Sequence, residues 1–197
     1  MDIKTQAVDI GEVIRARRTQ KPDKLNGRKI NDETINELLA LADWAPTHAR
    51  TEPWRFIVYA GDKVGEFTNH HADLFREHTP EESFNELKYD NIKKLGNNVS
   101  HIIIAWMKRI PTHKIPEIEE VSATAAAIQT LLLAATSKGI SSFWSTGGMA
   151  HSPVMRKELR LSEEDRVLGI LYLGYSDEPL REGIRMIPLS EKIEWIK

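Results

Sequence analysis

Residues 118–138, IEEVSATAAAIQTLLLAATSK, decide the fold because they predict one long helix that is apolar on nearly every side. A helix of this kind must be buried over most of its surface. Thr124, Gln129 and Thr130 interrupt the run, and its apolar part is shorter than the roughly 20 residues needed to cross a bilayer. We therefore expect a core or subunit-interface helix, ended by Gly139, and no membrane association.

Segments with the composition of strands lie on both sides of this helix. Residues 99–107 and 166–175 are nearly continuous apolar runs, which is typical of central strands that are buried on both faces. Residues 53–60 are rich in aromatic and β-branched side chains and predict another strand. Residues 140–144 predict a short strand, followed by a Ser-Thr-Gly-Gly loop.

The N-terminal part predicts a short helix over residues 8–18, followed by a polar loop over residues 19–31. Arg15, Arg17 and Arg18 gather at the C-terminal end of this helix. Cations at that position suit the partial negative charge of a helix C-terminus.

Three later regions also predict helices. Asn31, or the residue after it, is an N-cap for a helix that ends before residue 46. Residues 62–96 are charged and predict one or two surface helices with a break near Pro80. Ser152 caps a further helix that runs to about residue 159. The tail after Asp177 has little periodicity and is expected to be extended.

Composition limits what the chain can do. With 197 residues and no internal linker, we expect a single domain over residues 1–197. The formal net charge of −2 gives no basic field for nucleic acid, so we expect no such partner. The chain has no cysteine, which excludes thiolate chemistry and disulfides, so redox chemistry would need a bound cofactor. No signal peptide follows Met1, and we expect a cytoplasmic protein.

Several common site patterns are missing. His70, His71 and His78 do not form a recognised metal motif, and we expect them on a solvated helix face, with no metal site. The chain has no P-loop motif, no GxGxxG dinucleotide fingerprint and no GxSxG nucleophile elbow.

Four segments instead follow one another in a suggestive order. They are Arg17-Arg18-Thr19, then Ala45-Pro46-Thr47-His48 with Glu52-Pro53-Trp54-Arg55-Phe56, then the alanine-rich helix, then Phe143-Trp144-Ser145-Thr146-Gly147-Gly148. Together they resemble the FMN-dependent nitroreductase family, and most closely its small single-domain members. The resemblance implies an α+β sandwich, with a central, mostly antiparallel sheet flanked by helices. It also implies a homodimer with the long helix at its interface and FMN lined by both chains.

The Arg-Arg-Thr segment suits a phosphate group. Arg17 and Arg18 carry forked donors, and Thr19 adds a hydroxyl and a backbone N–H. The resemblance places the first arginine on the FMN phosphate, whereas the alternative from the residues alone is a solvated, basic helix end. Lys21 lies where family members often carry a cation that reaches toward the flavin, although it is also an ordinary loop lysine.

The segment around Pro46 supplies a second candidate set. The resemblance implies that Trp44, Thr47 and His48 contact the cofactor, and His48 is the candidate donor to the flavin or to a substrate. The alternatives are a core tryptophan and a turn histidine. Glu52 departs from the family, which usually has glutamine there, and an ionised carboxylate can only accept hydrogen bonds.

The loop after the short strand supplies the third set. The resemblance assigns Trp144, Ser145, Thr146 and Gly147 to the flavin, because glycine lets the backbone approach a ring and adjacent amides can donate to it. The alternative is a Gly-Gly turn beside a buried tryptophan. In the tail, Arg185 is either a second phosphate ligand or a surface arginine.

The resemblance implies an oxidoreductase that passes electrons from NADH or NADPH through FMN to a nitroaromatic compound, a quinone or a similar small acceptor, by a ping-pong mechanism. A nicotinamide that binds only transiently over the flavin needs no Rossmann motif. Two alternatives stay open. One is a related flavin reaction, such as reductive dehalogenation or flavin fragmentation, and the other is a non-catalytic flavin-binding dimer.

Overall fold

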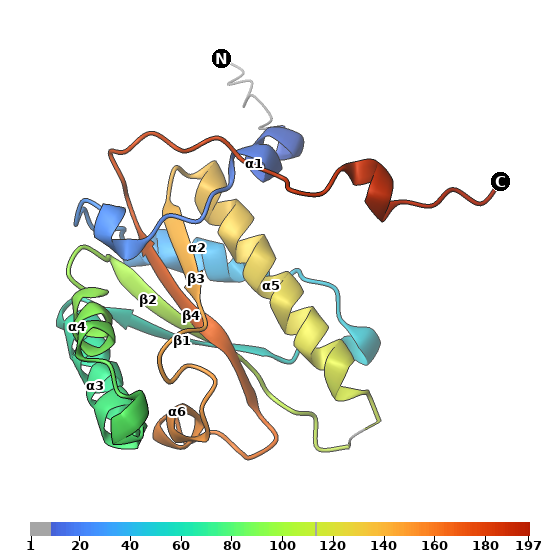
Figure 1. The fold of residues 1–197 in the computed structure, drawn as a ribbon. Coiled ribbons are helices and arrows are strands. Elements are labelled where there is room, and N and C mark those ends of the chain that lie inside the picture. Colours follow the sequence, from blue (N-terminus) through green and yellow to red (C-terminus); the bar gives the residue numbers. More distant parts are fainter. Residues whose placement is uncertain (1–8, 113) are drawn as a thin grey trace.

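The computed structural model describes residues 9–112 and 114–197, in which six α-helices surround one four-stranded sheet (Figure 1). The expected α+β class is confirmed. The helices are α1 (Ile10–Ala16), α2 (Asp32–Ala42), α3 (Asp62–His78), α4 (Glu86–Lys94), α5 (Glu117–Ser137) and α6 (Pro153–Glu158). The strands are β1 (Trp54–Ala60), β2 (His101–Met107), β3 (Ser141–Ser145) and β4 (Arg166–Gly174). Short 3₁₀ turns cover Pro22–Lys24, His48–Arg50, Glu81–Ser83 and Leu189–Lys192.

The sheet is antiparallel, with strand order β1-β2-β4-β3. The two long apolar runs form the central strands β2 and β4, as the sequence predicts for strands buried on both faces. The register pairs Ile103 with Leu171 across the centre, and Phe143 with Tyr172 at the β3 edge.

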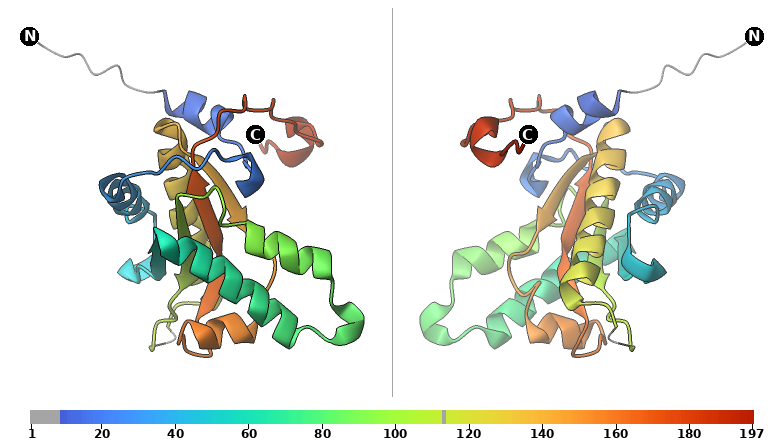
Figure 2. Two further views of the ribbon diagram at one scale, coloured as in Figure 1. Left: turned by 90° about the vertical axis from the view of Figure 1, so that its left-hand side faces the viewer. Right: turned by 90° about the vertical axis from the view of Figure 1, so that its right-hand side faces the viewer.

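Helices cover both faces of the sheet, as Figures 1 and 2 show. Helices α2 and α5 lie on one face, where they pack with Ile103 and Leu171. Helices α3, α4 and α6 lie on the other, where Ile102, Ile104 and Tyr172 join the core. Successive side chains of a strand point to opposite faces, so both halves of each apolar run are buried.

Helix α5 packs against α2 and all four strands, as a core helix does. Its length and composition would also permit a membrane span, but core helices of this kind meet the same criteria. Gly139, with a φ of 69°, follows its C-terminus, and its N–H donates to the Thr136 carbonyl at 3.0 Å. The expected burial on nearly all sides is reached only in part, because Ile118, Ser122 and Gln129 are exposed in the single chain.

The first helix is shorter than predicted. Residue 8, its predicted start, lies outside the described residues, and α1 ends at Ala16 rather than at residue 18. Arg17 already has extended dihedral angles, with φ of −56° and ψ of 124°. The helix stops here because Thr19 forms a parallel bridge with Ser142 of β3, which pulls the chain alongside the sheet.

The prediction of surface helices over residues 62–96 with a break near Pro80 is confirmed. Helix α3 buries one face, with Val64, Phe67 and Leu74 in the core, and leaves its opposite face exposed. The solvated histidine face is wrong for His71, which is only 2% exposed. No group of three potential ligands that could hold a metal ion occurs in the described part of the chain.

Candidate functional site

Four of the predicted cofactor residues line one cavity of about 360 Å³, which we call the Arg17 cavity. They are Arg17, Thr19, Trp144 and Thr146, and the remaining lining residues are Gln129, Leu132 and Ser142. The cavity forms where the segment after α1 runs beside β3, held by the Gln20 N–H that donates to the Ser142 carbonyl at 2.9 Å. It therefore presents a guanidinium, three hydroxyls and a carboxamide to one small volume.

The two adjacent arginines have different surroundings. Arg18 has a structural role, because its guanidinium donates hydrogen bonds to the carbonyls of Arg15, Arg17 and Arg181 at 2.6–2.8 Å. These bonds tie the C-terminal tail to the end of α1. The half-buried guanidinium of Arg17 has no hydrogen-bond or ion-pair partner within residues 9–112 and 114–197. Among the residues that the structure describes, Arg17 and not Arg18 offers this cavity a guanidinium without a partner.

A β-bulge in β4 positions Trp144. The register skips Leu168, because Ala105 lies opposite Gly169 and Trp106 opposite Val167. The Leu168 carbonyl accepts a hydrogen bond from the indole Nε1 of Trp144 at 2.9 Å. Bulges of this kind commonly re-aim side chains beside functional sites. Here the indole is held against the sheet, with the cavity beside it.

The loop after β3 is held from the opposite side of the sheet by His71. The Met149 N–H donates to Nε2 of His71 at 2.9 Å, and the ring lies so close to Gly148 that a Cβ there would be 2.5 Å from Nε2. Burial, with a smaller contribution from His70, lowers the pKa of His71 to about 4. The ring is therefore neutral at pH 7 and acts as an acceptor that positions the loop.

Thr47 and His48 line a separate cavity of about 440 Å³, beside the first turns of α5. Nδ1 of His48 lies 2.5 Å from Oε2 of Glu119, so this carboxylate orients the imidazole. On α5, Ser122 and Ala126 of this cavity and Gln129 of the Arg17 cavity follow at steps of four and three residues. The two cavities therefore lie along one flank of the same helix.

The backbone of this second set is strained. Ala49, Arg50 and Glu52 have φ values of 51°, 56° and 42°, which residues with a side chain seldom adopt. The Glu52 N–H donates to Oγ1 of Thr47 at 3.2 Å, and the Glu52 side chain itself is exposed. Strain that the surrounding structure maintains is often found beside functional sites.

The other predicted site residues lie elsewhere in the single chain. Lys21 is exposed beside α4 and lines a different cavity, and Arg185 is exposed in the tail. Trp44 is 87% exposed, so the core alternative is wrong for it. Ser145 and Gly147 are sequence neighbours of Thr146 but do not line the Arg17 cavity. They are joined by a hydrogen bond in which the Gly147 N–H donates to Oγ of Ser145.

Comparison with known proteins gives the family. The model of the nitroreductase family matches residues 14–175. This range is most of the chain and includes the Arg17 cavity and the cavity lined by Thr47 and His48. The chain belongs to the nitroreductase family. A relative from Bacillus subtilis, YfhC, which is provisionally named an NAD(P)H nitroreductase, is 28% identical over 169 residues, covering 85% of this chain and 84% of YfhC.

Solved structures of the nitroreductase family have the same fold. A nitroreductase-like family protein from Bacillus cereus superposes with a TM-score of 0.84 and 27% identity, covering 98% of each chain. The FMN-dependent nitroreductase NfnB from Mycobacterium smegmatis, solved in complex with NADPH, has a TM-score of 0.72 and 19% identity. It covers 95% of this chain and 98% of its own, and at this identity the likeness concerns the fold alone.

Sequence reasoning missed several residues of this candidate site. Gln129 interrupts the apolar run of α5, and a polar side chain on such a helix was the signal that it faces a cavity. The contacts of Glu119 and His71 could not be predicted in this way, because their partners lie 71 and 78 residues away in the chain. Only the folded chain brings them together.

Proposed function

We propose that this nitroreductase-family chain is an FMN-dependent oxidoreductase that uses NADH or NADPH to reduce nitroaromatic compounds, quinones or similar small acceptors. The observation that carries the proposal is the guanidinium of Arg17, which has no partner in the described ranges and lines a cavity together with Thr19, Gln129 and Thr146. This donor set fits FMN, since a guanidinium suits its phosphate, and hydroxyls and a carboxamide suit its polar ribityl chain.

When bound, FMN would accept a hydride from the nicotinamide and pass two electrons on after the oxidised donor has left. For a nitro compound the balance is R–NO₂ + NAD(P)H + H⁺ → R–NO + NAD(P)⁺ + H₂O. The chain's own tasks are to bind and to orient. Arg17 would hold the phosphate, and Trp144, fixed by the Leu168 carbonyl, would form a flat wall of the cavity.

The acceptor also needs protons, and His48 is the candidate group to supply one. Glu119 fixes its Nδ1, so that Nε2 is the nitrogen from which a proton would be delivered. In the single chain, however, His48 lines a different cavity from Arg17. For this reason we propose that each site is completed by residues of a second copy.

Exposed apolar side chains support a homodimer with α5 at its interface. Monomeric proteins seldom leave many large apolar side chains in water, and such clusters mark association sites. Residues of this kind lie on α1, at the start of α5, before β1 and along the tail: Ile10, Ile14, Ile118, Trp44, Ile184, Met186, Leu189, Trp195 and Ile196. Figure 1 shows the tail running past α1 and away from the body. We propose further that residues 1–197 form one domain, and that it works in the cytoplasm, where nicotinamide donors are abundant.

Anaerobic bleaching tests the reaction. The purified protein, loaded with FMN if necessary, should be yellow, should lose its flavin absorbance on addition of NADH or NADPH, and should regain it when a nitroaromatic compound or a quinone follows. Protein that stays colourless after incubation with FMN contradicts the proposal. Yellow protein that neither donor bleaches would instead be the non-catalytic flavin-binding dimer. Colour regained only with a halogenated acceptor would indicate reductive dehalogenation.

Light scattering tests the assembly independently. The full chain should have the mass of two copies, and replacing Trp195 with serine should weaken association if the exposed tail takes part in it. A monomer that binds FMN would contradict the proposal that each site is completed by a second copy.

A further inference from the structure

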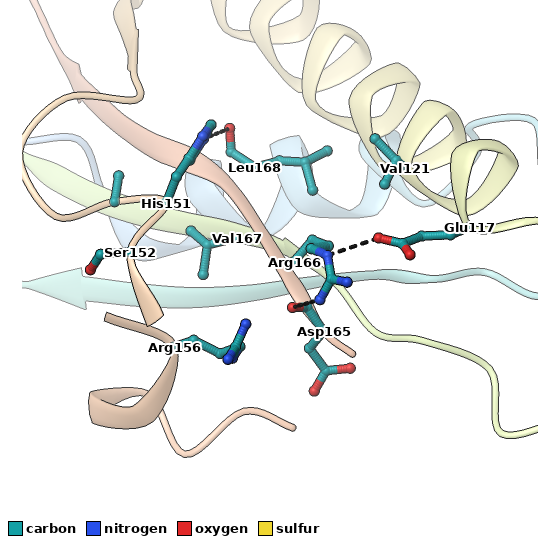
Figure 3. A pocket seen from close by; sticks show the side chains of 10 residues that line it. Glu117, Val121, His151, Ser152, Arg156, Asp165, Arg166, Val167 and Leu168 are labelled. Atoms are coloured by element: carbon teal, nitrogen blue, oxygen red, sulfur yellow. Dashed lines mark hydrogen bonds and ion pairs between the residues drawn. The ribbon is translucent and has the colours of Figure 1, made fainter. Parts of the chain in front are cut away.

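Another cavity, of about 380 Å³, opens between α6, the start of β4 and the first turns of α5 (Figure 3). We call it the Arg156 cavity. None of its residues was singled out as a site residue from the sequence. Its lining is formed by Glu117, Val121, Ala150, His151, Ser152, Arg156, Asp165, Arg166, Val167 and Leu168.

Both carboxylates of this cavity are already engaged. Oε1 of Glu117 lies 2.8 Å from Nε of Arg166, and Figure 3 shows this pair at the edge of the cavity. Asp165 is buried and accepts hydrogen bonds from the backbone N–H groups of Arg109 and Ser162 at 2.9 and 2.8 Å. Neither carboxylate needs a cation from a ligand.

Arg156 is not engaged in this way. Its half-buried guanidinium extends from α6 toward β4 and has no hydrogen-bond or ion-pair partner in the described part of the chain. The nearby Arg166 is held by Glu117 and by the carbonyls of Glu163 and Asp165. A forked donor without an acceptor, placed at the wall of a cavity, suits a carboxylate that can bind with both oxygens.

The lining also has an apolar part. Val121, Ala150, Val167 and Leu168 contribute apolar side chains, and His151 and Ser152 add polar groups beside them. An occupant that uses both parts has a small flat or apolar body and one carboxylate, as an aromatic acid does.

The Arg156 cavity adjoins the Arg17 cavity through one carbonyl group. The Leu168 oxygen accepts from Nε1 of Trp144 at 2.9 Å on one side, and Nε2 of His151 lies 3.5 Å from the same oxygen on the other. Trp144 lines the Arg17 cavity, and His151 lines the Arg156 cavity. Lining residues of the two cavities therefore meet at the Leu168 oxygen.

We propose that Arg156 binds the carboxylate of a small aromatic acid, and that the electron acceptor of this chain carries such a group. The first part concerns binding alone. The second part rests on the proposed function, because it assigns the Arg156 cavity to the acceptor of that reaction.

Titration calorimetry of the full chain with benzoate, compared with its neutral analogue benzamide, tests the binding. Benzoate should bind and benzamide should not. Arg156→Gln should weaken benzoate binding about 10- to 100-fold, as expected for the loss of a charge-assisted pair. Lys157→Gln is the matched control, because it removes the same charge from the next residue of α6, where the side chain is exposed. Circular dichroism of each variant establishes that it is folded.

Three results would overturn the binding site. They are no measurable binding of benzoate, equal binding of benzamide, and equal losses in Arg156→Gln and Lys157→Gln. Arg156→Lys gives a further measurement, because it keeps the charge without the fork and should restore only part of the affinity.

Turnover with 4-nitrobenzoate and 4-nitrobenzamide tests the acceptor. The acid should have the lower KM, and Arg156→Gln should remove the difference by raising the KM of the acid to that of the amide, whereas Lys157→Gln should keep it. Equal KM values in the unmodified protein would overturn the acceptor assignment. Failure of the proposed function looks different, because neither donor would then bleach the protein while benzoate would still bind.

Discussion

The indole of Trp144 occupies the space that a side chain at position 169 would need. Built on the backbone of Gly169, a Cβ would overlap Nε1 and Cδ1 of the indole and lie 2.9 Å from the Ser145 carbonyl oxygen. Gly169 also has a φ of 155°, within the range that favours glycine. The absence of a side chain at Gly169 is therefore what leaves room for the indole of Trp144 beside the bulge in β4.

Gly169→Ala should expel the indole from this place. We expect a loss of about 1–3 kcal/mol in the free energy of unfolding, measured in urea, and weaker binding of FMN. Gly139→Ala is the matched control, since it also has a positive φ but no atom within 4 Å of the new Cβ. If both variants lost the same stability and bound FMN equally, backbone strain alone would account for the effect.

Arg17→Ala should lower FMN affinity about 10- to 100-fold, because it removes a charge-assisted bond to the phosphate, and should leave stability nearly unchanged. Fluorescence titration with FMN measures the affinity. Arg15→Ala removes an equal charge from the same end of α1 and should have little effect, as its side chain is 73% exposed. Arg18→Ala should instead loosen the tail, seen as faster proteolysis after residue 177, because it breaks the bond to the Arg181 carbonyl.

Acid should destabilise the fold through His71. Its folded-state pKa of about 4 lies below the ordinary 6.5, so the unfolded chain takes up the proton more readily. The stabilisation is complete above pH 6.5 and is lost as the pH falls toward 4, by about 3 kcal/mol in all. His71→Gln keeps an acceptor for Met149 without titrating there, and its unfolding free energy should fall less over this range. Parallel curves for the two proteins would assign the acid sensitivity to other groups.

Removing Glu120 should be the most damaging change among the acids of α5. Its fully buried carboxylate pairs with Arg109 and accepts from the Ile110 N–H at 3.2 Å. Glu120→Ala would leave Arg109 buried without its anion and should cost about 3–5 kcal/mol in urea unfolding. Glu119→Ala, one residue earlier and exposed, should cost less than about 1 kcal/mol. A cost for Glu120→Ala no larger than this would contradict the assigned role.

The sequence was sufficient for the architecture because both central strands bury nearly every residue and α5 buries an apolar face against them. Their apolar runs leave little choice of placement, and the cap at Asn31 is confirmed by its bond from the Thr34 N–H at 2.8 Å. The Arg17 cavity was also predictable in part, since the family motifs name four of its lining residues.

The remainder depends on contacts between distant segments. Position 71 follows Val64 and Phe67 at helical spacing, so the pattern held a signal for the burial of His71 that was missed, but its bond to the Met149 N–H joins segments 78 residues apart. The early end of α1 follows from the bridge between Thr19 and Ser142, which are more than a hundred residues apart. The difference between Arg17 and Arg18 follows from the path of the tail, which has no periodicity to predict it.

The bulge at Leu168 means that the number of residues in β4 determines which face of the sheet each side chain occupies. Val167 and Ile170 join the same core although three positions separate them, which a regular strand does not allow. Deleting one residue here would turn the first part of β4 over, take Arg166 away from Glu117 and put Val167 on the wrong face. An insertion or deletion in this strand would therefore disrupt the sheet, the place of the indole, the Arg17 cavity and the Arg156 cavity in a single step.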